Sequence, residues 1–295
     1  MPKKRLDVDW RREIGKDDLN PAIKRYKRYL EDCGLRASTI PMYLLHVTKY
    51  LEFSQTDAPC ADDFARFRDY LLDMKLSRST INNYSFSIRK YHEMLGQNVS
   101  FAFVKPNNTI PYHFDESDIE RLFGVCNNIK HLAMLKTMFY ASLRASELCN
   151  LDDSDIDIKA LTLFVHGGKG GKDGLAYFTD DCAKTLRRYP EVRAPLVIDG
   201  RKPLFYTDFG GRWERRSVYR MFMQYKKLAG IEKHGGVHVF SRHSVGSLLV
   251  KRGCDIVTIK ELMRHSDVHT TMRYLHISDA TKREKYERYL GAGCI

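Results

Sequence analysis

Two arginines, a lysine, a histidine and a tyrosine between positions 144 and 274 form a set that can transfer a phosphoryl group: Arg144, Lys169, Arg242, His265 and Tyr274. A phosphodiester attacked by an oxygen nucleophile accumulates negative charge on its non-bridging oxygens, and guanidinium forks are suited to bind those oxygens. A tyrosine hydroxyl is a covalent nucleophile, and a lysine whose pKa is lowered by nearby cations can protonate the leaving alkoxide. This chemistry requires no metal ion, and no cofactor is expected.

The set is distributed over four short segments: Ala141–Leu148, Gly167–Lys172, Ser241–Ser244 and Leu262–Tyr274. The second is a glycine-rich turn that could be mistaken for a nucleotide-binding loop. It lacks the Gly-Lys-Ser/Thr ending of a P-loop, and it joins two expected strands rather than a strand and a helix. Nucleotide binding is therefore not predicted.

In these segments the chain resembles the tyrosine recombinases, the family of phage integrases and Xer-type resolvases. The family's sequences contain a Leu-Arg-x-Ser-Glu-Leu box, a Gly-Lys-Gly-x-Lys hairpin, a His-x-x-Arg-His box and a Leu-Gly-His-Ser…Thr-Thr-x-x-Tyr ending. Their counterparts here are, in order, Leu143–Leu148, Gly168–Lys172, Val239–His243 and Leu262–Tyr274. The intervals also fit: 25 residues from the first arginine to the lysine, 23 from the second arginine to the histidine, and 9 from there to the tyrosine. The resemblance runs from about residue 19 to about residue 290.

The resemblance implies a role for each residue. Tyr274 attacks the scissile phosphate and leaves a 3′-phosphotyrosyl bond and a free 5′-hydroxyl, while Arg144 and Arg242 hold the non-bridging oxygens. Lys169 protonates the departing 5′ oxygen, and His265 donates a hydrogen bond to the phosphate. Three further residues are expected to support the site: Glu147, His238 and His243. Glu147 is expected to orient the region of Arg144.

The chain departs from the family at three places. Val239 stands where the family has its first histidine, and a valine can neither transfer a proton nor donate a hydrogen bond. His238, one position earlier, is a substitute if the loop is reshaped. Smaller differences are Met263-Arg264 in place of Leu-Gly, and Gly174 where a basic residue usually follows the hairpin.

Each of these residues also has an ordinary structural explanation. Arginines at helix starts usually face solvent or pair with carboxylates, and Lys169 could simply be exposed in its turn, with Lys172 as a rival. His265 could cap the C-terminus of a helix, where cations are favoured. Tyr274 could be a core residue; the alternative nucleophiles would be Tyr286 and Tyr289, whose distance from His265 fits the family poorly.

The first hundred residues are predicted to be helical. Helices are expected to open at Asn20-Pro21, at Ser38-Thr39, at Asp62 and near Ser79-Thr80, with apolar residues at helical spacing after each opening. The second and fourth openings share the pattern Ser-Thr-Ile-x-x-Tyr. Hydroxyl groups before an apolar run favour helix capping, and they also place N–H groups where a phosphate can bind.

Seven residues are candidates for contact with DNA: Lys24, Lys27, Ser38, Thr39, Ser79, Thr80 and Lys172. The first two belong to the basic and aromatic run at 24–29. An ordinary solvated helix face, with the tyrosines directed to the core, explains that run equally well.

We predict a flexible arm at 1–16, a helical core DNA-binding domain at 17–100, a linker at 101–113, a catalytic domain at 114–278 and a tail segment at 279–295. Short alternating runs at 156–158, 161–165 and 175–178 predict strands. The expected fold is mainly α with a small antiparallel β-sheet. By resemblance, the two domains form a clamp around DNA, and the tail docks on a neighbouring protomer; a plain surface helix is the alternative for the tail.

The composition favours an anionic partner. The formal net charge is +12, and Lys and Arg side chains bind nucleic-acid phosphates. Seven scattered cysteines without a Cys-x-x-Cys pair argue against a disulfide framework and a zinc site. No signal peptide and no membrane span are expected, so a cytoplasmic protein is predicted.

Double-stranded DNA is the expected partner, and the resemblance implies a homotetramer on paired sites. The expected activity is site-specific DNA recombination. Two alternatives remain open: a catalytically silent DNA-binding regulator, which Val239 favours, and a type IB topoisomerase-like enzyme that shares the chemistry.

Overall fold

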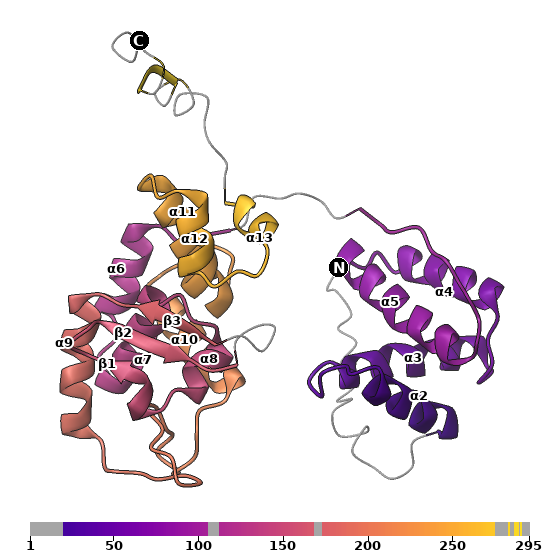
Figure 1. The fold of residues 1–295 in the computed structure, drawn as a ribbon, viewed down its shortest axis with the longest axis horizontal. Helices are drawn as coiled ribbons and strands as arrows, with labels where there is room; N and C mark the ends of the chain where they lie inside the picture. The colour runs from indigo at the N-terminus through magenta and orange to yellow at the C-terminus, as the bar shows by residue number, and fades with distance from the viewer. Residues whose placement is uncertain are drawn as a thin grey trace. The chain divides into compact units, whose positions relative to one another are not determined.

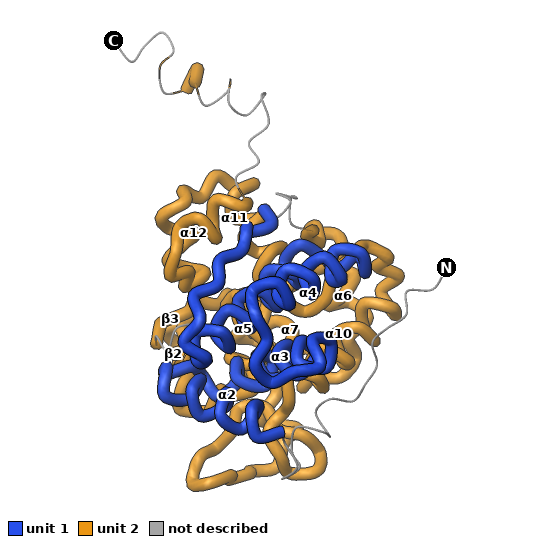
Figure 2. Tube along the Cα trace, turned by 90° about the vertical axis from the view of Figure 1, so that its right-hand side faces the viewer, with its two compact units in different colours: residues 1–108 blue, residues 109–295 orange. Residues whose placement is uncertain are grey.

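The computed structural model describes residues 20–105, 112–167, 173–274, 283, 286–288 and 290. The chain divides into two compact units, 1–108 and 109–295 (Figures 1 and 2). In the part described, helices dominate and the sheet is a single small antiparallel one, so the predicted fold class is confirmed. No helix among these residues is both long and apolar enough to cross a bilayer.

The first unit contains α2 (Pro21–Asp32), α3 (Ile40–Ser54), α4 (Ala61–Asp73) and α5 (Arg78–Met94). Its core is rich in tyrosines that are buried at the ring and hydrogen-bonded at the hydroxyl. Tyr26 is fully buried and donates to the carbonyl of Ser87 at 2.6 Å. Tyr26 of the basic run therefore points to the core, while Lys24 and Lys27 are exposed.

Helix openings are mostly where the sequence predicts them. Asn20 accepts a hydrogen bond from the N–H of Ala22 and caps α2. The prediction near Ser79-Thr80 is off by a few residues, because Ser77 caps α5 through the N–H of Thr80. Thr39 occupies the cap position of α3 without a side-chain cap bond.

The start of the predicted linker is fastened to the first unit. Asn82 donates to the carbonyl of Val104 at 2.8 Å and accepts from its N–H at 3.0 Å. Phe101 and Val104 also pack against the first core. At the other described end, the N–H of Phe114 donates to Ser244 of the second unit at 2.9 Å. Residues 106–111 lie outside the described residues.

The second unit begins with α6 (Glu116–Gly124), the apolar α7 (Ile129–Tyr140) and the short α8 (Ala145–Asn150), followed by the 3-10 turn η1 (Asp153–Asp155). Strands β1 (Ile156–Asp157), β2 (Thr162–Val165) and β3 (Gly174–Tyr177) form an antiparallel sheet in chain order. Leu163 lies opposite Ala176 in the register of β2 and β3, and both are buried. The period of two in the sequence therefore gives the sheet one core face.

The remaining elements of the second unit are α9 (Asp180–Arg188), η2 (Tyr189–Val192), α10 (Arg215–Leu228), the π-helical turn η3 (Val239–His243), α11 (Ser244–Lys251), α12 (Ile256–Leu262) and α13 (Val268–Met272). The last three helices gather at one end of this unit (Figure 1). Together with η3 they position the residues of the two C-terminal boxes beside those of the first box.

Candidate active site

Arg144 lies at the N-cap of α8, where its guanidinium is held by a buried carboxylate. Glu147 accepts from the Arg144 backbone N–H at 2.9 Å and from its Nη1 at 2.5 Å. Burial alone would raise the pKa of Glu147, but the Arg144 N–H and the charges of Arg144 and Arg264 outweigh it and hold this pKa below its ordinary value. A charged Glu147 orients Arg144, whose side chain keeps 21% exposure.

Arg242 lies inside the molecule, in the π-helical turn η3. Its side chain is among the largest that are fully buried, and its two terminal nitrogens donate to the carbonyls of Ser142 at 2.8 Å and Met263 at 2.6 Å. Burial and the neighbouring guanidiniums of Arg144 and Arg264 lower the pKa of Arg242 to about 9. The group stays positive at neutral pH, and two of its five N–H donors are used by these bonds.

Arg264 is a third guanidinium at the same place. It donates to the carbonyls of Ala141 and Ser142 at 3.2 and 3.3 Å and to Glu147 at 3.1 Å. Its backbone has φ 51°, the left-handed region that favours glycine. The sequence signalled only that an arginine replaces the family's glycine, and reasoning from the sequence missed its place beside Arg144 and Arg242.

His265 follows α12 and faces the same region. Its Nδ1 lies 2.9 Å from the hydroxyl of Thr271, a fully buried residue of α13, and the imidazole is 9% exposed. The ring is stacked toward that of Tyr274, with centroids 6.4 Å apart. The Thr271 contact fixes the ring orientation, because one nitrogen is already engaged.

Tyr274 follows α13 and contacts a second histidine. Its hydroxyl lies 3.0 Å from Nδ1 of His243. The ring is 7% exposed and belongs to a small core cluster with Ile259 and Met263. Burial raises the pKa of Tyr274, while the positive charges of Arg242, Arg273 and Arg144 oppose the increase. The ring is thus packed in the core, and its hydroxyl lies on His243 within the electrostatic influence of the arginines.

The structure does not bring His238 to the tyrosine. His238 is exposed and its ring meets that of His243 edge-on, with centroids 5.0 Å apart. The half-buried Val239 begins η3 and packs against the second core. The histidine with a ring nitrogen at hydrogen-bond distance from the Tyr274 hydroxyl is His243.

An open cavity of about 730 Å³ lies beside Arg144 and His265. Arg144, Gly174, Lys260, Arg264 and His265 are among the residues that line it. Lys169 and Lys172 lie outside the described residues. The hairpin that carries them starts and ends beside this cavity, since Val165 pairs with Gly174 and Asp173 lines the rim.

Six candidate DNA contacts belong to the first unit, and four of them lie at the starts of its helices. Ser38, Thr39, Ser79 and Thr80 are exposed or half-exposed at the N-termini of α3 and α5. Lys27 pairs loosely with Glu31 one helical turn away, at 3.8 Å. Lys24, the sixth candidate in this unit, precedes Lys27 on α2. Each of these side chains can be reached from solvent.

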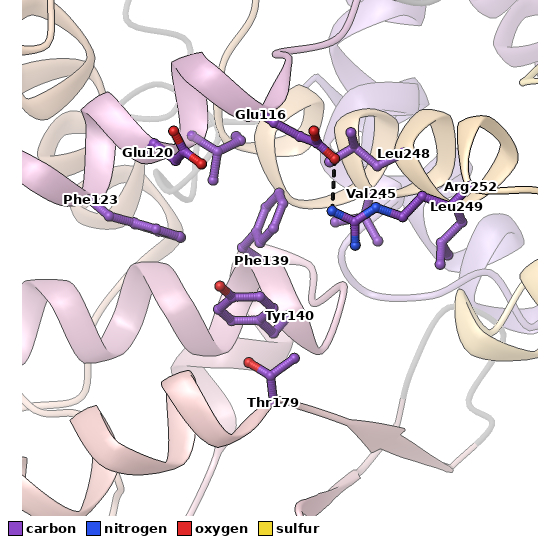
Figure 3. A pocket seen from close by; sticks show the side chains of 11 residues that line it. Glu116, Glu120, Phe123, Phe139, Tyr140, Thr179, Val245, Leu248, Leu249 and Arg252 are labelled. Carbon is purple, nitrogen blue, oxygen red and sulfur yellow. Dashed lines mark hydrogen bonds and ion pairs between the residues drawn. The ribbon is translucent and has the colours of Figure 1, made fainter.

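A smaller groove of about 320 Å³ lies elsewhere on the second unit, between α6, α7 and α11 (Figure 3). Its walls include Phe123, Phe139, Val245 and Leu249, and one end is closed by the ion pair of Glu116 with Arg252 at 2.7 Å. Among residues 20–105, 112–167 and 173–274 and the few described beyond them, no His, Cys, Asp and Glu side chains are grouped to hold a metal ion.

Residues 113–281, more than half of the chain, match the phage integrase family. The chain belongs to this family. It is 28% identical over 284 residues to tyrosine recombinase XerA of Pyrococcus horikoshii, covering 94% of this chain and 95% of that protein. It is 32% identical over 178 residues to a tyrosine recombinase of Thermosipho africanus, covering 59% and 60%.

Solved structures agree with this assignment. A crystal structure of XerA recombinase matches with a TM-score of 0.54 and 26% identity, over 92% of this chain and 99% of that chain. The Tn1549 transposon integrase, solved with circular intermediate DNA, shares the fold with a TM-score of 0.72 at 20% identity, over 90% and 99%. This tyrosine recombinase is a DNA strand-transferase by class, and the predicted recognition is confirmed.

Proposed function

We propose that this tyrosine recombinase cleaves and rejoins duplex DNA at specific sites through a 3′-phosphotyrosyl bond to Tyr274. The observation that supports this most is the convergence of Tyr274, Arg144 and Arg242 from three distant segments, with Arg144 at the edge of an open cavity. The positive charges of both arginines act on the Tyr274 hydroxyl. Cationic donors beside an oxygen nucleophile are what attack on a phosphodiester requires.

In this mechanism the phosphate occupies the cavity in front of Arg144. Arg144 and Arg242 bind the non-bridging oxygens, and His265, oriented by Thr271, donates a further hydrogen bond. The Tyr274 oxygen forms its bond to phosphorus while the bond to the 5′ oxygen breaks, and Lys169 gives that oxygen its proton. The covalent bond conserves the energy of the phosphodiester, so a 5′-hydroxyl from another strand can reverse the step.

The first experiment looks for the covalent adduct. Nicked suicide duplexes, tiled across the DNA that flanks the gene, are incubated with the protein without added metal and then denatured. Wild-type protein should give a denaturation-resistant adduct that Tyr274→Phe lacks. An adduct that persists in Tyr274→Phe would refute the assignment, and specific binding without any adduct would indicate the silent regulator that Val239 suggests. Exchange between paired sites separates recombination from the topoisomerase alternative.

We further propose that the active form is a homotetramer and that the C-terminal tail of one protomer occupies the groove of Figure 3 on another. Among the described tail residues, Tyr286 and Leu290 are four positions apart and expose 66% and 65% of their surface. Residues at this spacing lie on one side of a helix. An apolar pair of this kind fits a groove walled by Phe123, Phe139 and Leu249.

Charge substitution in the groove tests this assembly. Leu248→Glu should weaken tetramer formation on paired sites and recombination, while cleavage of a single suicide site changes little, because Leu248 lines the groove and packs against the larger core rather than against the cluster of Tyr274. Leu228→Glu is the matched control, because Leu228 is an exposed leucine, 61% accessible, at the end of α10 and does not line the groove. If both variants lose the tetramer equally, or if neither loses it, the proposal that the C-terminal tail occupies the groove is contradicted. Light scattering of the DNA complexes measures the assembly.

A further inference from the structure

The nucleophilic tyrosine needs a proton acceptor, and the residue at the expected position, Val239, cannot be one. We propose that His243 is the general base that accepts the Tyr274 proton during cleavage and returns it during rejoining. The inference rests on the proposed function, because it assigns a residue to the same reaction. The carrying observation is the distance of 3.0 Å between Nδ1 of His243 and the Tyr274 hydroxyl, which is within the range for a candidate base and the proton that it takes.

The π-helical turn explains why this histidine reaches the tyrosine. In η3 the N–H of Ser244 bonds to the carbonyl of Val239, five residues back. This wider turn buries the side chain of Arg242 completely and leaves that of His243 half-buried beside Tyr274. Single π turns of this kind occur often at functional sites.

The position of the tyrosine ring is also fixed. The ring lies flat against Gly246 of α11, where a Cβ would come within 2.8 Å of the Tyr274 ring carbon Cε2. Any side chain at 246 would push the ring away. The glycine therefore lets the hydroxyl sit at the distance from His243 that proton transfer needs.

Protonation states support the assignment. Burial, then the charges of His238, Arg273 and Arg242, lower the pKa of His243 to about 4. The imidazole is neutral at pH 7 and can accept a proton at Nδ1 when its hydrogen is on Nε2. Tyr274 remains protonated there, because burial raises its pKa above 10.0. A bound phosphate would offset the repulsion from Arg242 and Arg273, and so raise the pKa of His243 when DNA is present.

In cleavage, the Tyr274 oxygen bonds to phosphorus and its hydrogen passes to Nδ1 of His243. The bond from phosphorus to the 5′ oxygen breaks, and that oxygen takes a proton from Lys169, in the role proposed above, to leave as a hydroxyl. The resulting imidazolium stays beside the phosphotyrosine. In rejoining, a 5′-hydroxyl gives its proton back to Lys169 and displaces Tyr274, and the imidazolium returns its hydrogen to the phenolate oxygen.

The test compares His243→Gln and His243→Ala with wild type on the suicide duplex that yields an adduct, in single turnover from pH 6 to 9. Glutamine can accept a hydrogen bond from Tyr274 but cannot take its proton. The matched control is His131→Gln, which alters another histidine–tyrosine pair of the same unit, with Nδ1 of His131 2.9 Å from the Tyr225 hydroxyl. DNA affinity and thermal unfolding of each variant are measured in parallel.

Both His243 variants should bind DNA normally and cleave about 100-fold more slowly at pH 7, in the range for loss of a general base. Their rates should rise about tenfold per pH unit, since hydroxide must then ionise Tyr274, whereas the wild-type rate should change little over this pH range. Cleavage by His243→Gln at the wild-type rate, cleavage by His243→Ala faster than by wild type, or pH profiles of the variants parallel to that of wild type would each refute His243 as the base. If wild type itself forms no adduct on any duplex, the proposed function fails and the inference with it.

Discussion

At the scale of single residues, one buried carboxylate serves two guanidiniums. Glu147 accepts hydrogen bonds from Arg144 and Arg264, and its side chain is 4% exposed. Removing one partner of a buried ion pair is costly, because the remaining charges lose their compensation. The carboxylate therefore both orients Arg144 and permits three arginines to lie together.

Glu147→Gln should lower the free energy of unfolding by about 3 kcal/mol at pH 7. The pKa of Glu147 lies below its ordinary value of 4.5 in the folded protein. A carboxyl with a depressed pKa stabilises the fold above its unfolded-state pKa, and this stabilisation is lost as the pH falls through the folded-state pKa. The difference between wild type and Glu147→Gln should accordingly be constant from pH 6 to 8 and shrink below about pH 4.5.

Urea unfolding at several pH values measures this difference. Glu261→Gln is the control, because Glu261 also borders the cavity but its side chain is 71% exposed and pairs with the adjacent Lys260 at 2.7 Å. A Glu147→Gln difference that does not shrink in acid would mean that the carboxylate charge is not what stabilises the arginine cluster.

At the scale of the elements, the turn after α12 combines a strained backbone with a useful side chain. Arg264 holds φ 51° and its Cδ would lie 2.9 Å from a Cβ at Gly174 of β3. The two departures from the family's sequence are thus neighbours. Glycine at 174 leaves the space through which the side chain at 264 reaches the carbonyls of α7's C-terminal turn.

Arg264→Gly and Arg264→Ala separate the two effects. Both lose the bonds to Glu147 and to the carbonyls of Ala141 and Ser142, but only glycine relieves the left-handed backbone. The glycine variant should be more stable than the alanine variant by about 1 kcal/mol, while both cleave DNA more slowly than wild type. Equal stability of the two in urea unfolding would show that the backbone at 264 relaxes at no cost.

Much of the fold could be predicted from periodicity, because amphipathic helices and alternating strands must bury one side. The N-terminal helices, the three strands and the fold class follow from it. The exact capping residue of α5 could not be predicted, since Ser77 and Ser79 are both good capping residues and tertiary packing decides between them. Hydrogen-bonding partners across distant segments were equally invisible: Arg264 was taken as a minor difference, and nothing local announces the π turn that directs His243 to Tyr274.

The site was predictable to the extent that its residues form boxes at fixed intervals. Arg144, Arg242, His265 and Tyr274 do come from elements that meet. The position of Lys169 stays a prediction, and so do the DNA contacts at the helix starts of the first unit. A motif specifies which side chains are present, but which one accepts a proton depends on angstrom-scale placement that only packing determines.

At the scale of the whole molecule, the charge of +12 predicts salt-dependent binding. Each neutralised phosphate releases counterions, so the logarithm of the affinity falls linearly with the logarithm of the salt concentration. Tyrosines on the core side of α2 leave Lys24 and Lys27 exposed. If these lysines bind phosphates, as we propose, they should contribute to this slope without affecting sequence preference.

Replacing both Lys24 and Lys27 with glutamine should reduce the slope by about 2, one unit per lost phosphate contact, and weaken specific and non-specific duplexes equally. The control is Lys159→Gln, which removes an exposed charge from the turn between β1 and β2, at the opposite end of β2 from the hairpin beside the cavity. Fluorescence anisotropy between 50 and 300 mM salt gives both slopes. If Lys159→Gln lowers the slope by as much per removed charge as the double variant does, overall charge attracts the DNA rather than contact through α2. An unchanged slope in the double variant would remove α2 from the interface.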